Sequence, residues 1–237
     1  MTNIRNLFKF LEDKEGVKTP LKAKFVYFSN EMTPDDLKVG GDLNLSNTPI
    51  TSLPDGLEVG DHLHLHKTKI TSLPDNLKVG GNLLLIHTPI TSLPDNLKVG
   101  GDLNLHETKI TSLPDDLKVG GNLVLSYTPI TSLPDNLKVR GALYLHDTPI
   151  TSLPNGLEVR DSLDLRYTPI TSLPDNLKVG GNLLLSYTPI TSLPDNLKVG
   201  GKLYLHDTPL SKEYSKEKIK RMIKDKGGKF NGEILAN

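Results

Sequence analysis

The histidines are the side chains of this chain best suited to chemistry near neutral pH, because imidazole titrates there and is a common metal ligand. All seven fall in four columns of a repeating sequence, which also hold five of the seven tyrosines. The histidines are His62, His64, His66, His87, His106, His146 and His206. This concentration suggests a metal site, a pH-sensitive contact or a binding surface.

The metal hypothesis rests on His62, His64 and His66, which share one face of an expected strand, and on His87 of the next strand. Residues i and i+2 lie about 6.5–7 Å apart along a strand, so these side chains must lean to share an ion. No carboxylate is fixed nearby. We predict no metal site and no cofactor, and a metal-binding protein remains the alternative.

Catalytic motifs are missing from the repeating sequence. No Ser-His-Asp set, glycine-rich phosphate loop or pair of carboxylates recurs. The chain has no cysteine, which excludes disulfides, zinc-thiolate sites and thiol catalysis and fits a reducing compartment. We therefore expect a protein that is not an enzyme and has no catalytic residue.

Charge and N-terminal sequence restrict the partners. The 237 residues include 28 Lys and Arg and 28 Asp and Glu, so the net charge is zero. Zero net charge argues against general nucleic-acid binding and against an anionic membrane surface. The N-terminal "MTNIRNLFKFLEDKEG" has neither a continuous apolar secretory segment nor a membrane-spanning one. We expect a cytoplasmic protein of bacterial or viral origin.

The elements that must position the histidines come from a twenty-residue repeat. Eight uninterrupted copies span residues 41–200, and a half-copy follows at 201–210. Leu43 and Leu45 alternate with polar residues, which predicts a half-buried strand in each copy, and the prolines predict an extended, turn-rich return. Six columns are apolar in every full copy; in the first they are Leu43, Leu45, Ile50, Leu53, Leu57 and Val59. One coil cannot bury them alone, so stacked coils must share one core.

Three columns at the corners of the coil carry further expectations. The column of Gly41 holds only Gly or Asp, which predicts a left-handed turn residue before each strand. The column of Thr48 is always Thr, which predicts hydrogen bonds to the backbone of neighbouring coils. In the column of Gly40, Arg140 and Arg160 replace Gly; we interpret them as tolerated replacements, with a small basic spot as the alternative.

Both ends depart from the repeat and are expected to cap it, because an open solenoid end exposes core and strand edge. Residues 1–40 are predicted to form an N-terminal cap, with a helix over 3–13 and a degenerate repeat over 21–40. The array spans 41–210, and a helical C-terminal cap spans 211–237. Tyr214, Ile219, Met222 and Ile223 give this cap a helical stripe, and Gly227 is its expected C-cap.

These motifs carry a family resemblance. "NLLLSYTPITSLP" (182–194) fits the pattern LxLxxNxLxxLP, and the unit resembles the twenty-residue bacterial leucine-rich repeats of the YopM and IpaH type. The resemblance implies a repeat solenoid with a parallel β-sheet on the concave face, an extended convex side and binding of host proteins. Thr replaces the Asn of that pattern, the second "LP" is "NL", and the IpaH catalytic cysteine domain is missing. A plain two- or three-sided β-solenoid is the structural alternative.

Variation between copies concentrates on one surface, at positions equivalent to 42, 44, 46 and 47, while "TSLPDNLKV" hardly changes. Drift on an exposed sheet would also have altered that second segment, so we predict a non-catalytic surface that binds a protein partner. The expected contacts are His64, His66, His87, His106, Tyr127, Tyr144, His146, Asp164, Arg166, Tyr167, Tyr187, Tyr204 and His206.

The resemblance further implies a bacterial effector, delivered into a host cell, or a phage-borne inhibitor. A self-assembling structural protein is the alternative of a different class. The sequence specifies neither the partner nor the oligomeric state.

Overall fold

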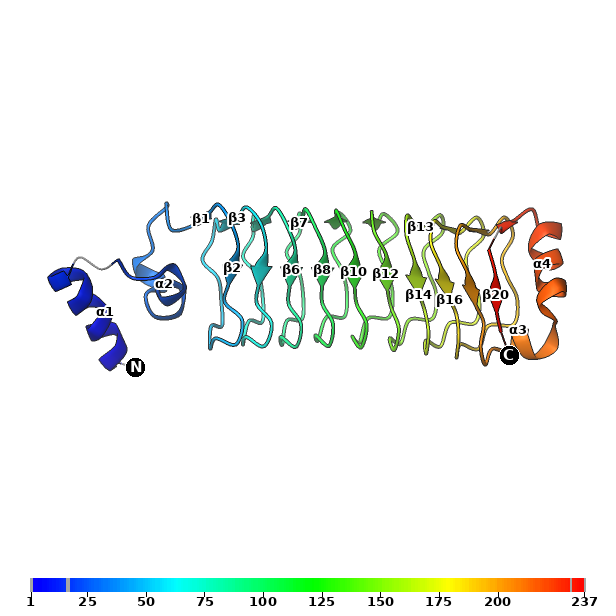
Figure 1. Cartoon of the computed structure of the whole chain (residues 1–237), viewed down its shortest axis with the longest axis horizontal. Helices are drawn as coiled ribbons and strands as arrows, with labels where there is room; N and C mark the ends of the chain where they lie inside the picture. Colours follow the sequence, from blue (N-terminus) through cyan, green and yellow to red (C-terminus); the bar gives the residue numbers. More distant parts are fainter. Residues whose placement is uncertain (1, 16–17, 231, 237) are drawn as a thin grey trace.

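The chain forms a solenoid with helices at both ends (Figure 1). A computed structural model describes residues 2–15, 18–230 and 232–236, without the side chains of residues 2 and 3. Residues 1, 16–17, 231 and 237 of the two predicted caps lie outside these described residues. The predicted leucine-rich-repeat-like solenoid of stacked twenty-residue coils is confirmed.

Each coil contributes two short strands, one to each of two parallel ten-stranded sheets. The first sheet contains β1 (Lys38–Val39), β3 (Glu58–Val59), β5 (Lys78–Val79), β7 (Lys98–Val99), β9 (Lys118–Val119), β11 (Lys138–Val139), β13 (Glu158–Val159), β15 (Lys178–Val179), β17 (Lys198–Val199) and β19 (Lys229–Phe230). The second contains β2 (Leu43–Asn44), β4 (Leu63–His64), β6 (Leu83–Leu84), β8 (Leu103–Asn104), β10 (Leu123–Val124), β12 (Leu143–Tyr144), β14 (Leu163–Asp164), β16 (Leu183–Leu184), β18 (Leu203–Tyr204) and β20 (Ile234–Leu235). Equivalent residues pair in register, as Leu123 does with Leu143.

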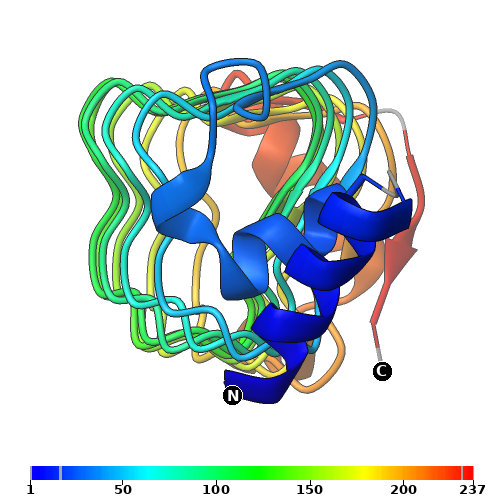
Figure 2. The ribbon, with the colours of Figure 1, turned by 90° about the vertical axis from the view of Figure 1, so that its left-hand side faces the viewer.

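The sequence predicted the second of these sheets but not the first. The array runs nearly straight in Figure 1, and its coils superimpose end-on in Figure 2. Strand pairing sets a spacing of about 4.8 Å between coils, and here it acts on two sides of each coil. Equal spacing on two sides of each coil keeps the array straight. We name the outward surface of the second sheet, β2 to β20, the variable face.

The core is one continuous stack of the six predicted columns. Leu125 and Ile130 are fully buried in one coil, and the equivalent residues are buried along the whole array. At the N-terminal end Phe25 packs onto the stack from a helix over Leu21–Tyr27, where the predicted degenerate repeat would place a strand, and at the C-terminal end Ile219 and Ile223 cover the stack. Burial of identical columns in every coil explains why these residues repeat so closely.

The predicted left-handed residue before each strand is wrong. Among the described residues of the array, positive φ occurs instead at two other positions of the coil. One follows the strand of the second sheet, as at Asn47 and Tyr127, and the other lies in the turn before the strand of the first sheet, as at Gly56 and Asn76. In most coils glycine before the strand leaves room for the preceding coil, although Asp61 and Asp161 also occupy this column. A Cβ at Gly101 would overlap the Asn82 side chain of the preceding coil.

The threonine column has a different role from the one predicted. Thr128 Oγ1 donates to the Leu125 carbonyl oxygen of its own coil at 2.6 Å, and the same bond recurs from Thr48 to Thr208. This bond closes the corner where the strand ends. The threonines therefore stabilise each coil internally and do not join neighbouring coils through this hydroxyl.

Helices flank the array. The N-terminal end has α1 (Thr2–Glu15), α2 (Leu21–Tyr27) and the 3-10 turn η1 (Ser29–Glu31). The C-terminal end has α3 (Pro209–Glu213) and α4 (Lys216–Asp225). The C-cap of α4 is Lys226, one residue before the predicted Gly227, which follows with a left-handed φ of 74°. β19 and β20 follow these helices and extend both sheets, so the predicted C-terminal cap also completes a coil.

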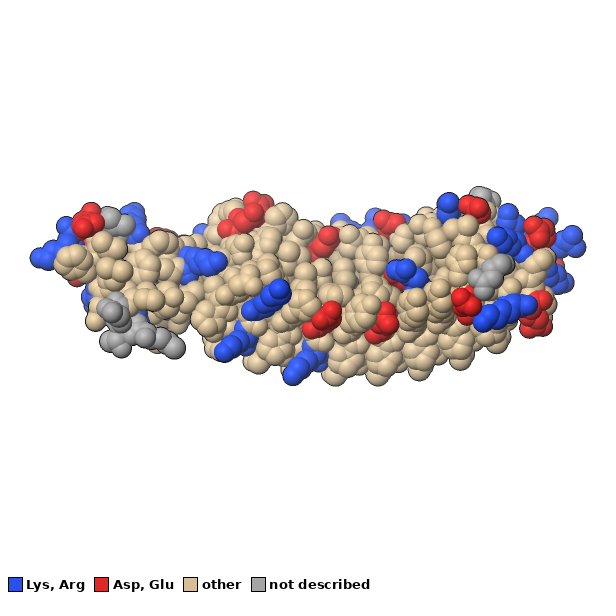
Figure 3. Space-filling view, turned by 60° about the horizontal axis from the view of Figure 1, so that its bottom comes forward, with Lys and Arg blue, Asp and Glu red and all other residues tan. Residues whose placement is uncertain are grey.

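Within the described residues, none of the helices has both the length and the apolar character needed to cross a membrane. Figure 3 shows scattered charges of both signs along one side of the rod and a concentration of basic atoms at the α4 end.

Asp36 fixes the turn that joins the N-terminal helices to β1. Its carboxylate accepts from Lys24 Nζ at 2.7 Å and from the Thr33 N–H at 2.9 Å, and these donors lower the pKa of Asp36, Lys24 first. A carboxyl whose pKa is lowered by folding stabilises above its unfolded pKa and loses that effect as pH falls through its folded value.

We therefore expect Asp36→Asn to lower the free energy of unfolding by about 1 kcal/mol at pH 7 and much less at pH 3. Urea unfolding at both pH values measures this. An equal loss at the two values would contradict the role of the ionised carboxylate.

Candidate functional site

The variable face consists of the side chains that point outward from the β2–β20 sheet and its edges. In the coil of β10 these are Asn122, Val124, Ser126 and Tyr127, while Leu123 and Leu125 point into the core. Alternation along the strand places the two sets on opposite sides of the sheet. The predicted inward and outward columns are thereby confirmed.

The first column of the variable face is structural. Its side chains accept hydrogen bonds from the backbone N–H of the equivalent residue in the next coil, as Asp102 Oδ1 does from Asn122 at 2.7 Å. Equivalent bonds involve Asp42, His62, Asn82, Asn122, Ser162 and Asn182 as acceptors. Sequence reasoning treated this column as free to recognise a partner, although its preference for Asn and Asp indicates a backbone ladder.

The last column of the variable face holds the most exposed aromatic residues. Tyr127, Tyr167 and Tyr187 are 50%, 52% and 47% exposed. Their backbones have φ of 59°, 58° and 63°, in the left-handed region that bulky side chains rarely adopt. Such a conformation costs about 1 kcal/mol or more per residue. Asn47 occupies the same position in the first coil, so this turn also accepts a residue that tolerates left-handed backbone better.

The aromatic and imidazole rings form a row across the coils. The Tyr127 ring meets His106 and His146 edge-on, each at 5.2 Å between centroids, and His87 meets His106 at 6.0 Å. Tyr167 and Tyr187 stack in parallel at 4.6 Å. The Glu107 carboxylate contacts two histidines of this row: it lies 2.9 Å from His87 Nδ1 and 3.2 Å from His106 Nε2.

The surroundings of Tyr127 and Tyr167 favour the neutral form of their hydroxyls. A hydrogen bond to Asp147 raises the pKa of Tyr127 above its ordinary value. Desolvation is the main cause of the raised pKa of Tyr167, and the neighbouring Tyr187 is the second cause. Neutral hydroxyls can donate and accept hydrogen bonds. The row therefore offers apolar ring surface together with polar tips.

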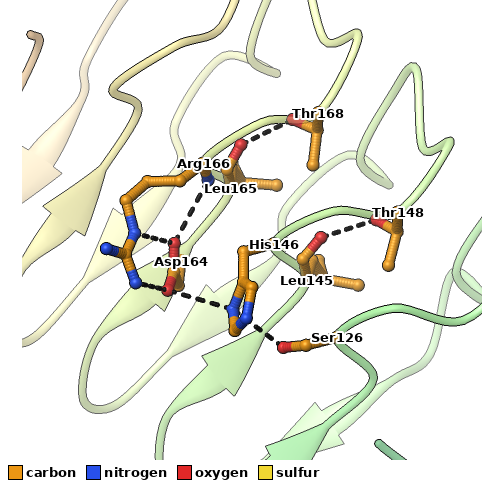
Figure 4. Close-up of polar contacts among 8 residues, drawn as sticks. All are labelled: Ser126, Leu145, His146, Thr148, Asp164, Leu165, Arg166 and Thr168. Atoms are coloured by element: carbon orange, nitrogen blue, oxygen red, sulfur yellow. Dashed lines mark hydrogen bonds and ion pairs between the residues drawn. The ribbon is translucent and has the colours of Figure 1, made fainter. Parts of the chain in front are cut away.

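A buried carboxylate organises the middle of the variable face (Figure 4). Asp164 is 2% exposed, and it accepts from Arg166 Nε at 2.9 Å and Nη2 at 2.7 Å. His146 Nδ1 lies 3.3 Å from Asp164 Oδ2, the oxygen that also accepts from Arg166 Nη2. The hydrogen bond to Asp164 raises the pKa of Arg166, so this cation is fixed on the face. Asp164 was predicted as a partner contact; its position makes it a support for Arg166 and His146.

Ser126, His146 and Asp164 resemble the members of a catalytic triad, but their geometry differs. Ser126 Oγ lies 2.9 Å from His146 Nδ1, and Asp164 Oδ2 lies 3.3 Å from the same nitrogen. A catalytic relay uses opposite ring nitrogens, one toward the carboxylate and the other toward the hydroxyl. Ser126 is also fully buried. The arrangement fixes the imidazole ring and does not activate the hydroxyl.

We expect Asp164→Ala to lower the free energy of unfolding by about 2 kcal/mol, because it removes two charge-assisted bonds. Removing one member of a fully buried pair costs about 3–5 kcal/mol, but Arg166 is partly exposed and can be hydrated. Urea unfolding measures the loss, with Asp115→Ala, an exposed carboxylate of the same array, as the control. Equal losses in the two variants would contradict a supporting role for Asp164.

The metal hypothesis finds no suitable geometry in the described part of the chain, where no group of three or more His, Cys, Asp or Glu side chains could hold an ion. His62 Nδ1 accepts from the Asn82 N–H at 2.9 Å, and His66 Nδ1 lies 2.8 Å from Ser46 Oγ. The His62 and His64 rings meet edge-on at 6.1 Å. His62 and His66 therefore have polar contacts with neighbouring coils, and His64 packs against His62 of its own coil.

The remaining predicted contacts lie on the same face with part of their surface exposed. They are His64, His66, Tyr144, Tyr204 and His206. The His206 N–H donates to Ser186 Oγ at 3.2 Å. The sequence thus placed all thirteen predicted residues on one surface, and it missed the buried Ser126 and the supporting role of Asp164.

Similarity to known proteins is found among solved structures. No protein-family model and no curated protein sequence matches the chain. Among solved structures, YopM, a leucine-rich effector protein from Yersinia pestis, is 18% identical with a TM-score of 0.47, over 86% of this chain and 67% of that one. With its twenty-residue repeat, leucine columns and stacked parallel strands, this chain is a leucine-rich-repeat-like solenoid.

Proposed function

We propose that this chain is a non-catalytic scaffold that binds a protein partner through its variable face. One observation carries the proposal: Tyr127, Tyr167 and Tyr187 are about half exposed and occupy left-handed backbone positions. Tyrosine there carries a cost in backbone strain, and half of its ring surface remains open to solvent. Exposed tyrosines with few rotatable bonds are characteristic of protein-binding surfaces.

The size and chemistry of the variable face support the same proposal. Ten strands about 4.8 Å apart give a surface roughly 43 Å long, which suits a standard interface of about 800 Å² per partner. The face combines aromatic rings with the fixed cation of Arg166 and the carboxylate of Glu107. Aromatic residues and arginine are enriched in interface centres.

We extend this proposal to the setting that the repeat resemblance implies, an effector or inhibitor acting on a host protein, in the cytoplasm or after delivery into a host cell. Expression of the tagged chain in candidate host cells tests this extension. A specific host partner supports it, and a partner from the producing organism alone contradicts it.

The test uses a face variant, Tyr127→Asn/Tyr167→Asn/Tyr187→Asn, and a control variant, Ser132→Ala/Ser172→Ala/Ser192→Ala. The control changes exposed residues of the same three coils outside the variable face. Quantitative affinity capture from the native cells should recover one partner with the wild type and the control, and lose it with the face variant. Equal capture by all three proteins would contradict the proposal.

Self-association is the second candidate function, and exposed apolar residues at the N-terminal end favour it. Ile4, Leu7 and Phe10 of α1 are 43%, 55% and 54% exposed. Sedimentation at rising concentration tests it: end-to-end assembly predicts a growing sedimentation coefficient that Leu7→Gln/Phe10→Gln abolishes. A constant monomer value at all concentrations would contradict it.

A further inference from the structure

The first sheet is interrupted at one step. Eight of its nine neighbouring strand pairs register at two positions, but β11 and β13 register only at Val139 opposite Val159. In the next coil the Lys178 N–H donates to the Leu157 carbonyl oxygen at 3.4 Å and the Gly180 N–H to Val159 at 2.9 Å. Within the described chain, the Arg160 N–H has no such bond to the Val139 carbonyl oxygen, whereas the glycines at the equivalent position donate to the valine of the preceding coil, as Gly120 does to Val99 at 2.9 Å. We call this step the seam.

Two arginines explain the seam. Each glycine equivalent to Arg160 packs against the preceding coil, and a Cβ at Gly120 would overlap the Gly100 carbonyl oxygen. An arginine at this position must therefore move its coil away. Arg140 does so slightly, because its N–H lies 3.3 Å from the Val119 oxygen, compared with 2.9 Å for Gly120 and Val99. At Arg160, which follows a coil already displaced by Arg140, the strand pairing shortens.

A third replacement removes another bond at the same step. Ala142 occupies the ladder column of the variable face and offers no side-chain acceptor to the Ser162 N–H, whereas the Asn182 N–H donates to Ser162 Oγ at 3.1 Å in the next coil. The second sheet stays intact beside it: the Leu143 N–H donates to the Ser162 oxygen at 2.9 Å and Leu145 to Asp164 at 2.8 Å. The opening is therefore confined to the first sheet and its adjoining corner.

A groove of about 480 Å³ lies at this step, with more basic than acidic side chains in its lining. Lys138, Arg140 and Arg160 contribute three cations, and Lys118 pairs in register with Lys138. The lining has two acidic residues, Asp135 and Glu158. Glu158 forms an ion pair with Lys178 at 3.3 Å. Within the described chain, no carboxylate lies within 4 Å of the three lining cations. Like charges held together without a counterion repel each other, so this groove favours an anion.

We propose that the seam is a binding site for a phosphoryl group. Arg140 and Arg160 project from coils about 4.8 Å apart, and each guanidinium can donate two parallel hydrogen bonds to oxygens of one dianionic group. Lys138 adds a third charge from the same groove. The site lies on the first sheet, so it goes beyond the proposed function and does not depend on it.

The phosphoryl group has two possible sources, free phosphate or a phosphorylated side chain. Titration with inorganic phosphate tests the first, and titration with a neutral peptide carrying one phosphoserine tests the second, each at constant ionic strength. A site for free phosphate binds both ligands with similar affinity. A site for a phosphorylated chain binds the peptide at least about tenfold more tightly, and the unphosphorylated peptide not at all.

Two variants separate charge from sheet geometry. Arg140→Gln/Arg160→Gln removes both charges and keeps side chains that hold the seam open. Arg140→Gly/Arg160→Gly removes the charges and restores the glycine column, so the amide of residue 160 should gain protection from hydrogen exchange. Lys98→Gln/Lys198→Gln is the control, since it removes two exposed charges from fully paired strands of the same sheet.

We expect the wild type and the lysine control to bind phosphate or phosphopeptide with a Kd of about 1 mM or lower, within about twofold of each other. Both arginine variants should bind at least about tenfold more weakly. The proposal is overturned if the wild type binds neither ligand at 20 times that concentration. It is also overturned if Arg140→Gln/Arg160→Gln binds as tightly as the wild type, or if the lysine control loses as much affinity.

Discussion

The face variant, Tyr127→Asn/Tyr167→Asn/Tyr187→Asn, should bind the partner at least about a hundredfold more weakly and still unfold within about 3 °C of the wild type. A buried interface tyrosine commonly contributes 1–2 kcal/mol or more, so three of them account for well over the 2.7 kcal/mol that a hundredfold change represents.

Stability should change little because two effects oppose each other. Asparagine tolerates the left-handed backbone at these positions, where φ is 58–63°, and relieves about 1 kcal/mol per site. Against this, the variant loses the stacking of Tyr167 on Tyr187 and the contacts of Tyr127 with His106 and His146, each worth about 0.5–1.5 kcal/mol.

Differential scanning calorimetry and a binding titration measure the two quantities on the same protein. The control Ser132→Ala/Ser172→Ala/Ser192→Ala should match the wild type in both. A face variant that binds normally, or that loses binding only because it is unfolded, would contradict the separation of recognition from stability on this face.

Leu125→Ala should lower the free energy of unfolding by about 3 kcal/mol, the largest stability effect that we expect of one substitution. Leu125 is fully buried, and the coils on both sides place Leu105 and Leu145 against the same column. Because each coil relies on its neighbours, the resulting cavity weakens two interfaces between coils.

Leu84→Ala is the matched control, since Leu84 lies on the variable face and is only partly buried. It should cost less than about 1 kcal/mol. Urea unfolding compares the two variants. Equal costs would mean that the inward and outward columns are assigned wrongly, because a slip of one residue exchanges the two sides of a strand.

The fold was predictable where side-chain chemistry repeats. Alternating Leu43 and Leu45 marked the second sheet, and the six apolar columns marked the stacked core. The first sheet escaped prediction although Leu137 and Val139 alternate with Lys138 as Leu43 and Leu45 do with Asn44. Its strand directly follows a proline-containing turn, and the whole segment was assigned to the extended return.

The left-handed positions were misplaced for a related reason. After each strand the positive φ is imposed by the corner of the coil, and residues as different as Tyr127 and Lys67 accept it, so composition gives no indication. In the other turn, Asp55-Gly56 and Asp75-Asn76 are the dipeptides that favour left-handed backbone. Glycine before the strand reflects contact between coils, which is visible only once the coils are stacked.

The candidate site was predictable as a surface but not as an arrangement. Variation among the copies identified the face, whereas the buried cluster of Ser126, His146 and Asp164 joins three different coils. Such contacts depend on side-chain length and on the spacing between strands. The seam likewise required three replacements, Arg140, Arg160 and Ala142, to be seen at one step of the stack.

Oxidative footprinting of the complex with the captured partner tests the central claim most directly. Hydroxyl radicals label exposed tyrosines, and mass spectrometry compares Tyr127, Tyr167 and Tyr187 with Tyr214 beside α4. Binding through the variable face predicts a loss of labelling of at least about threefold at the three face tyrosines and an unchanged rate at Tyr214. Unchanged labelling of the face tyrosines, with protection confined to the end of the rod, would contradict the account.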